Sequence, residues 1–164
     1  MIRVHTALRA FTLATLAAIP AAAQDHHGAQ STEKLGTVHF PTSCASAVAP
    51  RMDRAVALLH SFEFGASLRG FGEVLAADST CAMAQWGRAL SRWSNPMAAG
   101  NRAPAQLAEG KRFADEAERL ASRATDRERG YIAAVGRLYS DYEHVDQPSR
   151  VAAYERAMAD LVAR

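Results

Sequence analysis

One arrangement of large and small apolar residues occurs three times along the chain. In each occurrence a large residue is followed, at helical spacing, by a small alanine and then by two more large apolar residues. The three frames are Met52–Ala55–Val56–Leu59, Trp86–Ala89–Leu90–Trp93 and Tyr131–Ala134–Val135–Leu138. The second frame begins 34 residues after the first, and the third begins 45 residues after the second. A repeat of this length is typical of stacked helix pairs, in which each pair needs a neighbour to bury its apolar face.

Helical periodicity also continues through the rest of the chain after residue 49. Alanine and arginine are abundant, valine and isoleucine are sparse, and no run alternates with a period of two, so strands are not expected. The expected helices cover residues 50–61, 63–77, 81–93, 104–123, 125–142 and 146–164. The fifth opens with Thr125 and Glu128, which have the spacing of a capping box. We predict an all-α fold, an α-solenoid of about three antiparallel helix pairs, with an ordinary helical bundle as the alternative.

The first 23 residues have the pattern of an export signal. Arg3 and Arg9 give a positive start, an apolar run follows, and a small-residue cleavage site ends at Ala23. The apolar run has about half of the roughly 20 residues that a membrane span needs, so we expect a cleaved signal peptide; a retained anchor is the alternative. The mature protein is then periplasmic or secreted. It has a polar, irregular leader over residues 24–48, which we expect to dock onto the first helix, and a helical domain over 49–164.

The charge of the chain argues against some classes of partner. The formal net charge is +2, and both excess charges belong to Arg3 and Arg9 within the signal. The mature chain is therefore formally neutral, and it has no basic stripe or block of like charge. Nucleic acid is not an expected partner of such a chain.

Several segments have the pattern of one known repeat. Leu68–Ser79 reads as a second repeat helix followed by its turn, Ala82–Leu90 as the next first helix, and Val151–Ala159 as a further second helix. On these residues the chain resembles the tetratricopeptide repeat family over residues 50–164. The segment Leu35–Cys44 is similar to the leader of exported bacterial repeat proteins. The resemblance implies a non-catalytic scaffold that binds a protein or peptide in a groove lined by the first helix of each pair.

The resemblance also implies which residues line that groove. The apolar and aromatic candidates, with one histidine, are Met52, Val56, His60, Met83, Trp86, Leu90 and Trp93. Arg88 and Arg92, four residues apart on one helix, are candidates to hold a carboxylate of the partner. The alternative is that the tryptophans belong to the core and that both arginines are solvated.

The two cysteines are expected to pair. An exported chain favours a disulfide, and Cys44 and Cys81 lie just before the first and third expected helices. In a stacked array these two helices are parallel neighbours, so their N-terminal ends fall on the same side. Two free thiols or a pair of metal ligands are the alternatives.

Other chemistry has little support in the sequence. After cleavage the mature chain begins at Gln24, and His26 and His27 near its amine are a possible copper or nickel site, which gives a periplasmic metal-handling protein as the alternative function. No zinc-protease, nucleophile-elbow, phosphate-loop or C-x-x-C motif occurs, so we expect no enzyme activity and no cofactor. A helical domain of a larger enzyme is a third alternative. The last helix has no glycine cap or polar closing helix, so we expect an N-terminal portion of a longer protein.

Overall fold

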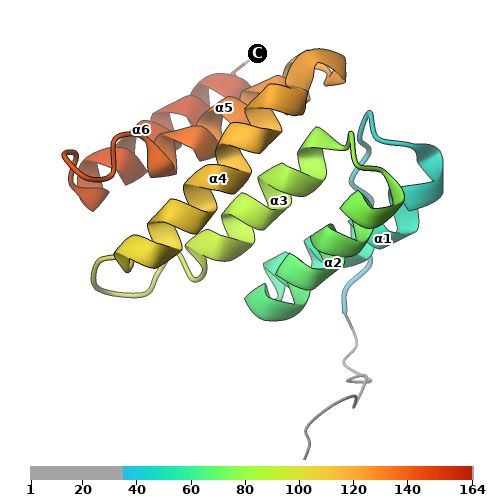
Figure 1. The fold of residues 1–164 in the computed structure, drawn as a ribbon, viewed down its shortest axis with the longest axis horizontal. Helices are drawn as coiled ribbons and strands as arrows, with labels where there is room; N and C mark the ends of the chain where they lie inside the picture. Colours follow the sequence, from blue (N-terminus) through green and yellow to red (C-terminus); the bar gives the residue numbers. More distant parts are fainter. Residues whose placement is uncertain (1–34, 164) are drawn as a thin grey trace, which may run out of the picture. The chain divides into compact units, whose positions relative to one another are not determined.

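The computed structural model describes residues 35–163, and each structural statement below concerns that part of the chain. It contains six α-helices and two short 3-10 turns, and no strand (Figure 1). The helices are α1 (Ala49–His60), α2 (Phe64–Ala77), α3 (Ala82–Trp93), α4 (Pro104–Leu120), α5 (Asp126–Tyr139) and α6 (Gln147–Val162), and the 3-10 turns are η1 (Ser46–Val48) and η2 (Ala121–Arg123). The prediction of an all-α fold is confirmed. The predicted signal peptide and the first part of the leader, residues 24–34, lie outside the described residues.

Prolines or side-chain caps mark where four of the six described helices begin: prolines open α1 and α4, and side chains cap α5 and α6. The capping box of α5 is present, because the Glu128 N–H donates to Thr125 Oγ1 at 3.2 Å and the Thr125 N–H donates to Glu128 Oε2 at 2.7 Å. Asp146 caps α6 by accepting the Ser149 N–H at 2.9 Å. Two predicted ends are wrong by three residues. The helix predicted over 104–123 stops at Leu120, where the 3-10 turn η2 follows it, and α5 stops at Tyr139 rather than Tyr142, because Ser140 has an extended ψ of 124°.

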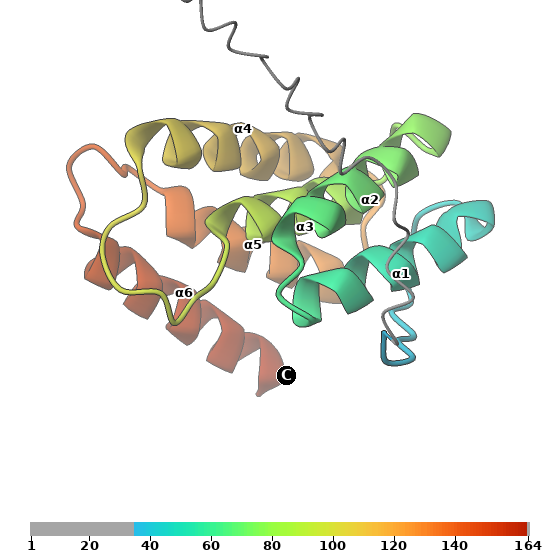
Figure 2. The same cartoon turned by 90° about the horizontal axis from the view of Figure 1, so that it is seen from below.

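The helices contact one another in a regular order. Each helix packs against the next one along the chain, and α1 also packs against α3, as α3 does against α5. The odd-numbered helices are therefore neighbours in space, and each even-numbered helix packs on one or two odd-numbered ones. Figure 2 shows α1 and α6 on opposite sides of α3 and α5.

Small residues allow these close helix contacts. The central alanine of each repeated frame is fully buried. A Cβ atom placed on Gly87 of α3 would lie 2.3 Å from the Phe71 ring of α2, and one on Gly110 of α4 would lie 2.2 Å from the Tyr139 ring of α5. Both glycines thus provide the space that an aromatic side chain of the neighbouring helix fills.

A disulfide joins the leader to the helical part of the chain. The sulfur atoms of Cys44 and Cys81 lie 2.05 Å apart, which is the length of a disulfide bond, and the Cα atoms are 4.9 Å apart. The structure thus contains the predicted pairing. Cys81 is the residue just before α3, so the bond fixes the end of the leader at the start of that helix. Between residues 35 and 163, no helix has both the length and the apolar character needed to cross a membrane.

Candidate functional site

The odd-numbered helices α1, α3 and α5 share one face, which we call the odd-helix face. The leader residues that follow Leu35 contact the first half of each of these helices. A cavity lies at the other end, where α1 and α3 finish. The leader was expected to dock onto the first helix, and it contacts α1 together with α3 and α5.

Phe40 of the leader occupies an aromatic slot, which we define as Trp86, Tyr131 and Arg127. The Phe40 ring is nearly parallel to the Trp86 ring, with centroids 5.5 Å apart, and is tilted against the Tyr131 ring at 6.1 Å. The guanidinium carbon of Arg127 lies 5.3 Å from the Phe40 centroid. These distances are typical of aromatic and cation–π contacts. Trp86 was predicted to line a groove, and here Phe40 packs against it.

The backbone of the leader is held by side chains of α1 and α5. The Phe40 N–H donates to Asp53 Oδ1 at 2.8 Å, and the Ser43 N–H donates to Glu128 Oε1 at 2.7 Å. Arg127 Nη2 donates to the Pro41 carbonyl oxygen at 2.7 Å. Sequence reasoning assigned no such role to these side chains, because they lie up to 86 residues from the leader atoms that they bind.

Glu128 is the most buried of these leader contacts, with 1% of its surface exposed. Burial alone raises the pKa of its carboxyl group. Hydrogen bonds from Thr125 and Ser43 favour the charged form and lower the pKa below its ordinary value, so the hydrogen bonds outweigh the burial. One carboxylate therefore caps α5 with one oxygen and holds the leader with the other. In the sequence, only its capping-box spacing from Thr125 indicated a structural role for Glu128.

The cavity at the far end of the odd-helix face has a volume of about 380 Å³. Its wall is mainly apolar and aromatic, as is typical of ligand sites. The apolar lining residues are Leu59, Phe62, Phe64, Leu90, Trp93, Pro96, Leu138, Val151 and Tyr154, and the polar ones are His60, Ser94, Arg102, Gln147 and Glu155. We call this space the apolar cavity.

Two residues at the border of the apolar cavity have strained backbones. Phe62 has a φ of 63°, and Ser94 has a φ of 68° with a ψ of −154°. Both regions favour glycine, and a non-glycine residue there costs about 1–3 kcal/mol. Asp141 is the one other non-glycine residue with positive φ in the described chain, and it does not line the cavity.

The strain at Phe62 comes from the way in which α1 ends. The Glu63 N–H donates to the Leu58 carbonyl at 3.0 Å and the Phe62 N–H donates to the Leu59 carbonyl at 3.2 Å. This is a Schellman motif, whose left-handed position is normally a glycine. Here that position holds a phenylalanine that is 52% exposed and packs edge-on against Phe64, with ring centroids 5.9 Å apart.

The predicted groove residues divide into three groups. Trp86 is 7% exposed and packs against Phe40 of the leader. His60, Leu90 and Trp93 line the apolar cavity. In contrast, Met52, Val56 and Met83 are at most 2% exposed and belong to the core. Their assignment to an accessible groove is wrong, because helical spacing identifies an apolar face but not the neighbour that covers it.

The predicted carboxylate clamp of Arg88 and Arg92 is also wrong. The Arg88 guanidinium lies 3.9 Å from the centroid of the Phe113 ring in α4, and burial lowers its pKa. Arg92 Nε lies 2.6 Å from Glu109 Oε2, also in α4, although no well-directed hydrogen bond joins them. Arg88 comes two residues after Trp86, and Arg92 two residues after Leu90. Two residues turn an α-helix by about 200°, so the arginines lie on the side of α3 opposite to the odd-helix face. Both side chains therefore point toward α4.

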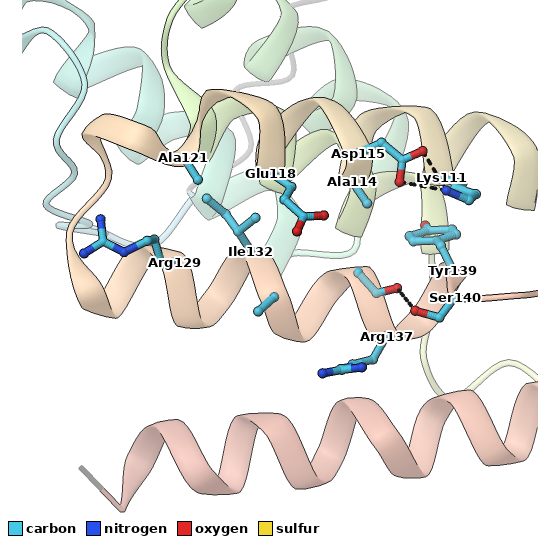
Figure 3. A pocket seen from close by; sticks show the side chains of 12 residues that line it. Lys111, Ala114, Asp115, Glu118, Ala121, Arg129, Ile132, Arg137, Tyr139 and Ser140 are labelled. Atoms are coloured by element: carbon cyan, nitrogen blue, oxygen red, sulfur yellow. Dashed lines mark hydrogen bonds and ion pairs between the residues drawn. The ribbon is translucent and has the colours of Figure 1, made fainter.

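A second hollow, of about 410 Å³, lies between α4 and α5 (Figure 3). Charged side chains line much of it, and several bond to residues of their own helix. Lys111 Nζ lies 2.7 Å from Asp115 Oδ2, and Ser140 Oγ donates to the Gly136 carbonyl at 3.0 Å. Tyr139 is the single aromatic residue in the lining of this hollow, whereas the apolar cavity has four, so we favour the apolar cavity as the binding site.

One group in the described residues has the spacing of a metal site, namely Cys44, Asp78 and Cys81. Its two sulfur atoms are bonded to each other, and the Asp78 carboxylate accepts the Ala45 N–H at 2.8 Å. That hydrogen bond lowers the pKa of Asp78 most, and the hydrogen bond from the Thr80 side chain lowers it further. The group is therefore a disulfide with a bonded carboxylate beside it. His26 and His27, the alternative metal ligands named in the sequence analysis, lie outside the described residues.

Comparisons with protein-family models, with curated proteins and with solved structures each gave no match. The resemblance to the tetratricopeptide repeat family therefore stays a prediction. By fold and site, the described residues form an all-α protein in which the leader docks on the three odd-numbered helices. Residues of these helices and of α6, with the loops after α1 and α3, line an apolar cavity.

Proposed function

We propose that this chain is a non-catalytic, exported scaffold that binds an extended peptide segment of a protein partner. The partner lies on the odd-helix face and inserts a large apolar side chain into the apolar cavity. The observation that carries this proposal is the pair of strained residues, Phe62 and Ser94, at the border of one cavity. Backbone strain of this kind is kept where function requires a side chain in a fixed position.

The order of helix contacts supports a tetratricopeptide-like solenoid. The odd-numbered helices contact one another, and α2 and α4 each contact the odd-numbered helix on either side. In such an array the first helix of each pair lines the concave groove, which here is the odd-helix face. The second helix of the last pair, α6, also contributes Val151 and Tyr154 to the wall of the apolar cavity on that face. The leader, as an extended segment on that face, is an example of the kind of ligand we propose.

The wall of the apolar cavity is held in place before a partner binds. Arg102 Nε donates to the Trp93 carbonyl at 2.7 Å, and the Arg102 N–H donates to Gln147 Oε1 at 2.8 Å. Gln147 Nε2 in turn donates to the Gly100 carbonyl at 3.1 Å. These bonds join α6, the end of α3 and the loop after it, so a partner has less conformational entropy to overcome on binding.

An exported location fits the other observations. Disulfides such as Cys44–Cys81 persist in oxidising compartments outside the cytosol. The formally neutral mature chain fits a protein or peptide partner better than a nucleic acid. Cleavage after Ala23 and delivery to the periplasm or the medium are part of the proposal.

A displayed library of random peptides, selected on the purified protein, tests this function. We expect the selected peptides to share a large apolar residue and to bind at least about tenfold more weakly to Phe62→Ser, since Phe62 lines the cavity. Met97→Ser is the matched control, because Met97 is 76% exposed and does not line the cavity. Selected peptides whose binding to Phe62→Ser is unchanged, or a selection without binders, would contradict the proposal.

A further inference from the structure

The leader is bound to the odd-helix face by contacts that a separate peptide is able to make. We propose that the aromatic slot is a second peptide-binding site, specific for an aromatic residue followed by proline in an extended segment. Residues 38–43 of the leader are its tethered occupant and compete with a partner segment of the same chemistry. This inference rests on the leader contacts and is independent of the apolar cavity.

The slot selects an aromatic ring. Trp86 stacks on one face of the Phe40 ring, with an angle of 9° between the ring planes, and Tyr131 packs against it at an angle of 49°. Arg127 lies near both rings, with its guanidinium carbon 5.3 Å from the Phe40 centroid and 5.6 Å from that of Tyr131. An aliphatic side chain offers neither the stacking nor the cation–π contact, so the slot distinguishes aromatic from aliphatic residues.

The remaining contacts recognise main-chain atoms, which every peptide has. Asp53 accepts the Phe40 N–H, Glu128 accepts the Ser43 N–H, and Arg127 donates to the Pro41 carbonyl. The residue after the aromatic one needs no backbone N–H donor, so a proline fits there, and its fixed φ keeps the segment extended. The position before the aromatic residue is open, because the His39 side chain is 83% exposed.

The disulfide makes the leader a strong competitor. The bond from Cys44 to Cys81 fixes the segment directly after Ser43 at the start of α3, next to the slot. Return of Phe40 to the slot is therefore intramolecular, with an effective concentration on the order of millimolar. A partner segment has to displace the leader, so removal of the Phe40 ring exposes the site to a free peptide.

A synthetic peptide with the sequence of residues 35–43, blocked at both ends, tests the competition by fluorescence anisotropy. We expect Phe40→Ala protein to bind this peptide at least about tenfold more tightly than the wild type, because the tethered ring no longer fills the slot. The same peptide with alanine in place of its phenylalanine is the control and is expected to lose binding. Phe62→Ser in the Phe40→Ala background is expected to leave binding unchanged, which separates this site from the apolar cavity.

Two results would overturn the proposal. One is Phe40→Ala protein that shows a cooperative thermal transition but binds the peptide no better than the wild type. The other is equal binding of the peptide and its alanine control. If Phe40→Ala does not fold, Phe40→Leu keeps an apolar side chain in the leader and is judged by the same two comparisons.

A library selection on the Phe40→Ala protein tests the specificity for a partner. We expect the peptides that require Tyr131 to share an aromatic residue followed by proline. Tyr131→Ala in the same background is expected to reduce their binding at least about tenfold, since Tyr131 is one wall of the slot. Peptides that depend on Tyr131 but lack an aromatic residue would refute the specificity.

Discussion

Replacement of Phe62 by glycine and by alanine separates the strain at this position from the contacts of its side chain. Both variants remove the aromatic ring and its edge-on contact with Phe64. They differ in one methyl group, and the φ of 63° at this position disfavours every residue except glycine. The comparison therefore reports the cost of the left-handed backbone, reduced by the greater entropy of glycine in the unfolded chain.

The sign of the difference follows from that backbone conformation. A non-glycine residue in the left-handed region costs roughly 1–2 kcal/mol, while the greater entropy of unfolded glycine costs about 0.5–1 kcal/mol in the opposite sense. We expect Phe62→Gly to be more stable than Phe62→Ala by about 0.5–1 kcal/mol. At an ordinary helical position alanine is the more stable residue by about that amount.

Urea unfolding followed by circular dichroism measures this difference, with equal slopes required for the two variants. The ordinary helical control is Gly72→Ala in α2, where an added Cβ meets no atom within 4 Å and φ is not positive. There we expect alanine to stabilise the protein. If Phe62→Ala is as stable as Phe62→Gly or more stable, the backbone at Phe62 is not strained, and the main support for the apolar cavity as a functional site is lost.

Three further predictions concern stability. Gly87→Ala places a methyl group 2.3 Å from an aromatic ring and is expected to lower the free energy of unfolding by about 1–3 kcal/mol, measured in urea; an unchanged midpoint would contradict the close packing of α2 and α3. Because the folded pKa of Glu128 is lowered, its contribution is present above the unfolded value near 4.5 and is lost as the pH falls through the folded pKa. Wild type is therefore expected to lose more stability than Glu128→Gln between pH 6 and pH 3, and parallel urea midpoints over that range would refute this. Replacement of both Cys44 and Cys81 by serine removes the disulfide, whose residues are 37 positions apart. We expect it to lower the free energy of unfolding by about 4 kcal/mol; an unfolding curve equal to that of the oxidised wild type would contradict this.

Local patterns in the sequence were sufficient to predict the helices. The three repeated frames and the capping box at Thr125 place α1, α3 and α5, and helical periodicity places α2, α4 and α6, within a few residues of their observed bounds. Helical period and caps depend on residues three or four positions apart, so they can be read without knowledge of the fold. The pairing of Cys44 with Cys81 followed from the expected order of those helices.

The binding surface could be predicted only in part, because it depends on contacts between distant residues. The frames identify the apolar face of each helix, but Met52 and Trp93 occupy equally apolar positions and only the second lines a cavity. The docking of Phe40 on Trp86 joins residues 46 positions apart, which no local pattern reports. The strain at Phe62 has no sequence signal, since a phenylalanine stands where a glycine would mark the turn.

The most direct test of peptide binding by the odd-helix face is a nuclear magnetic resonance titration. The isotope-labelled protein is titrated with a library-selected peptide, and the methyl signals are followed. We expect the largest shifts at methyl groups of the apolar cavity, from Leu59, Leu90, Leu138 and Val151. Shifts confined to Ala114 and Ala133 in the hollow between α4 and α5, or no shifts at all, would contradict binding on the odd-helix face.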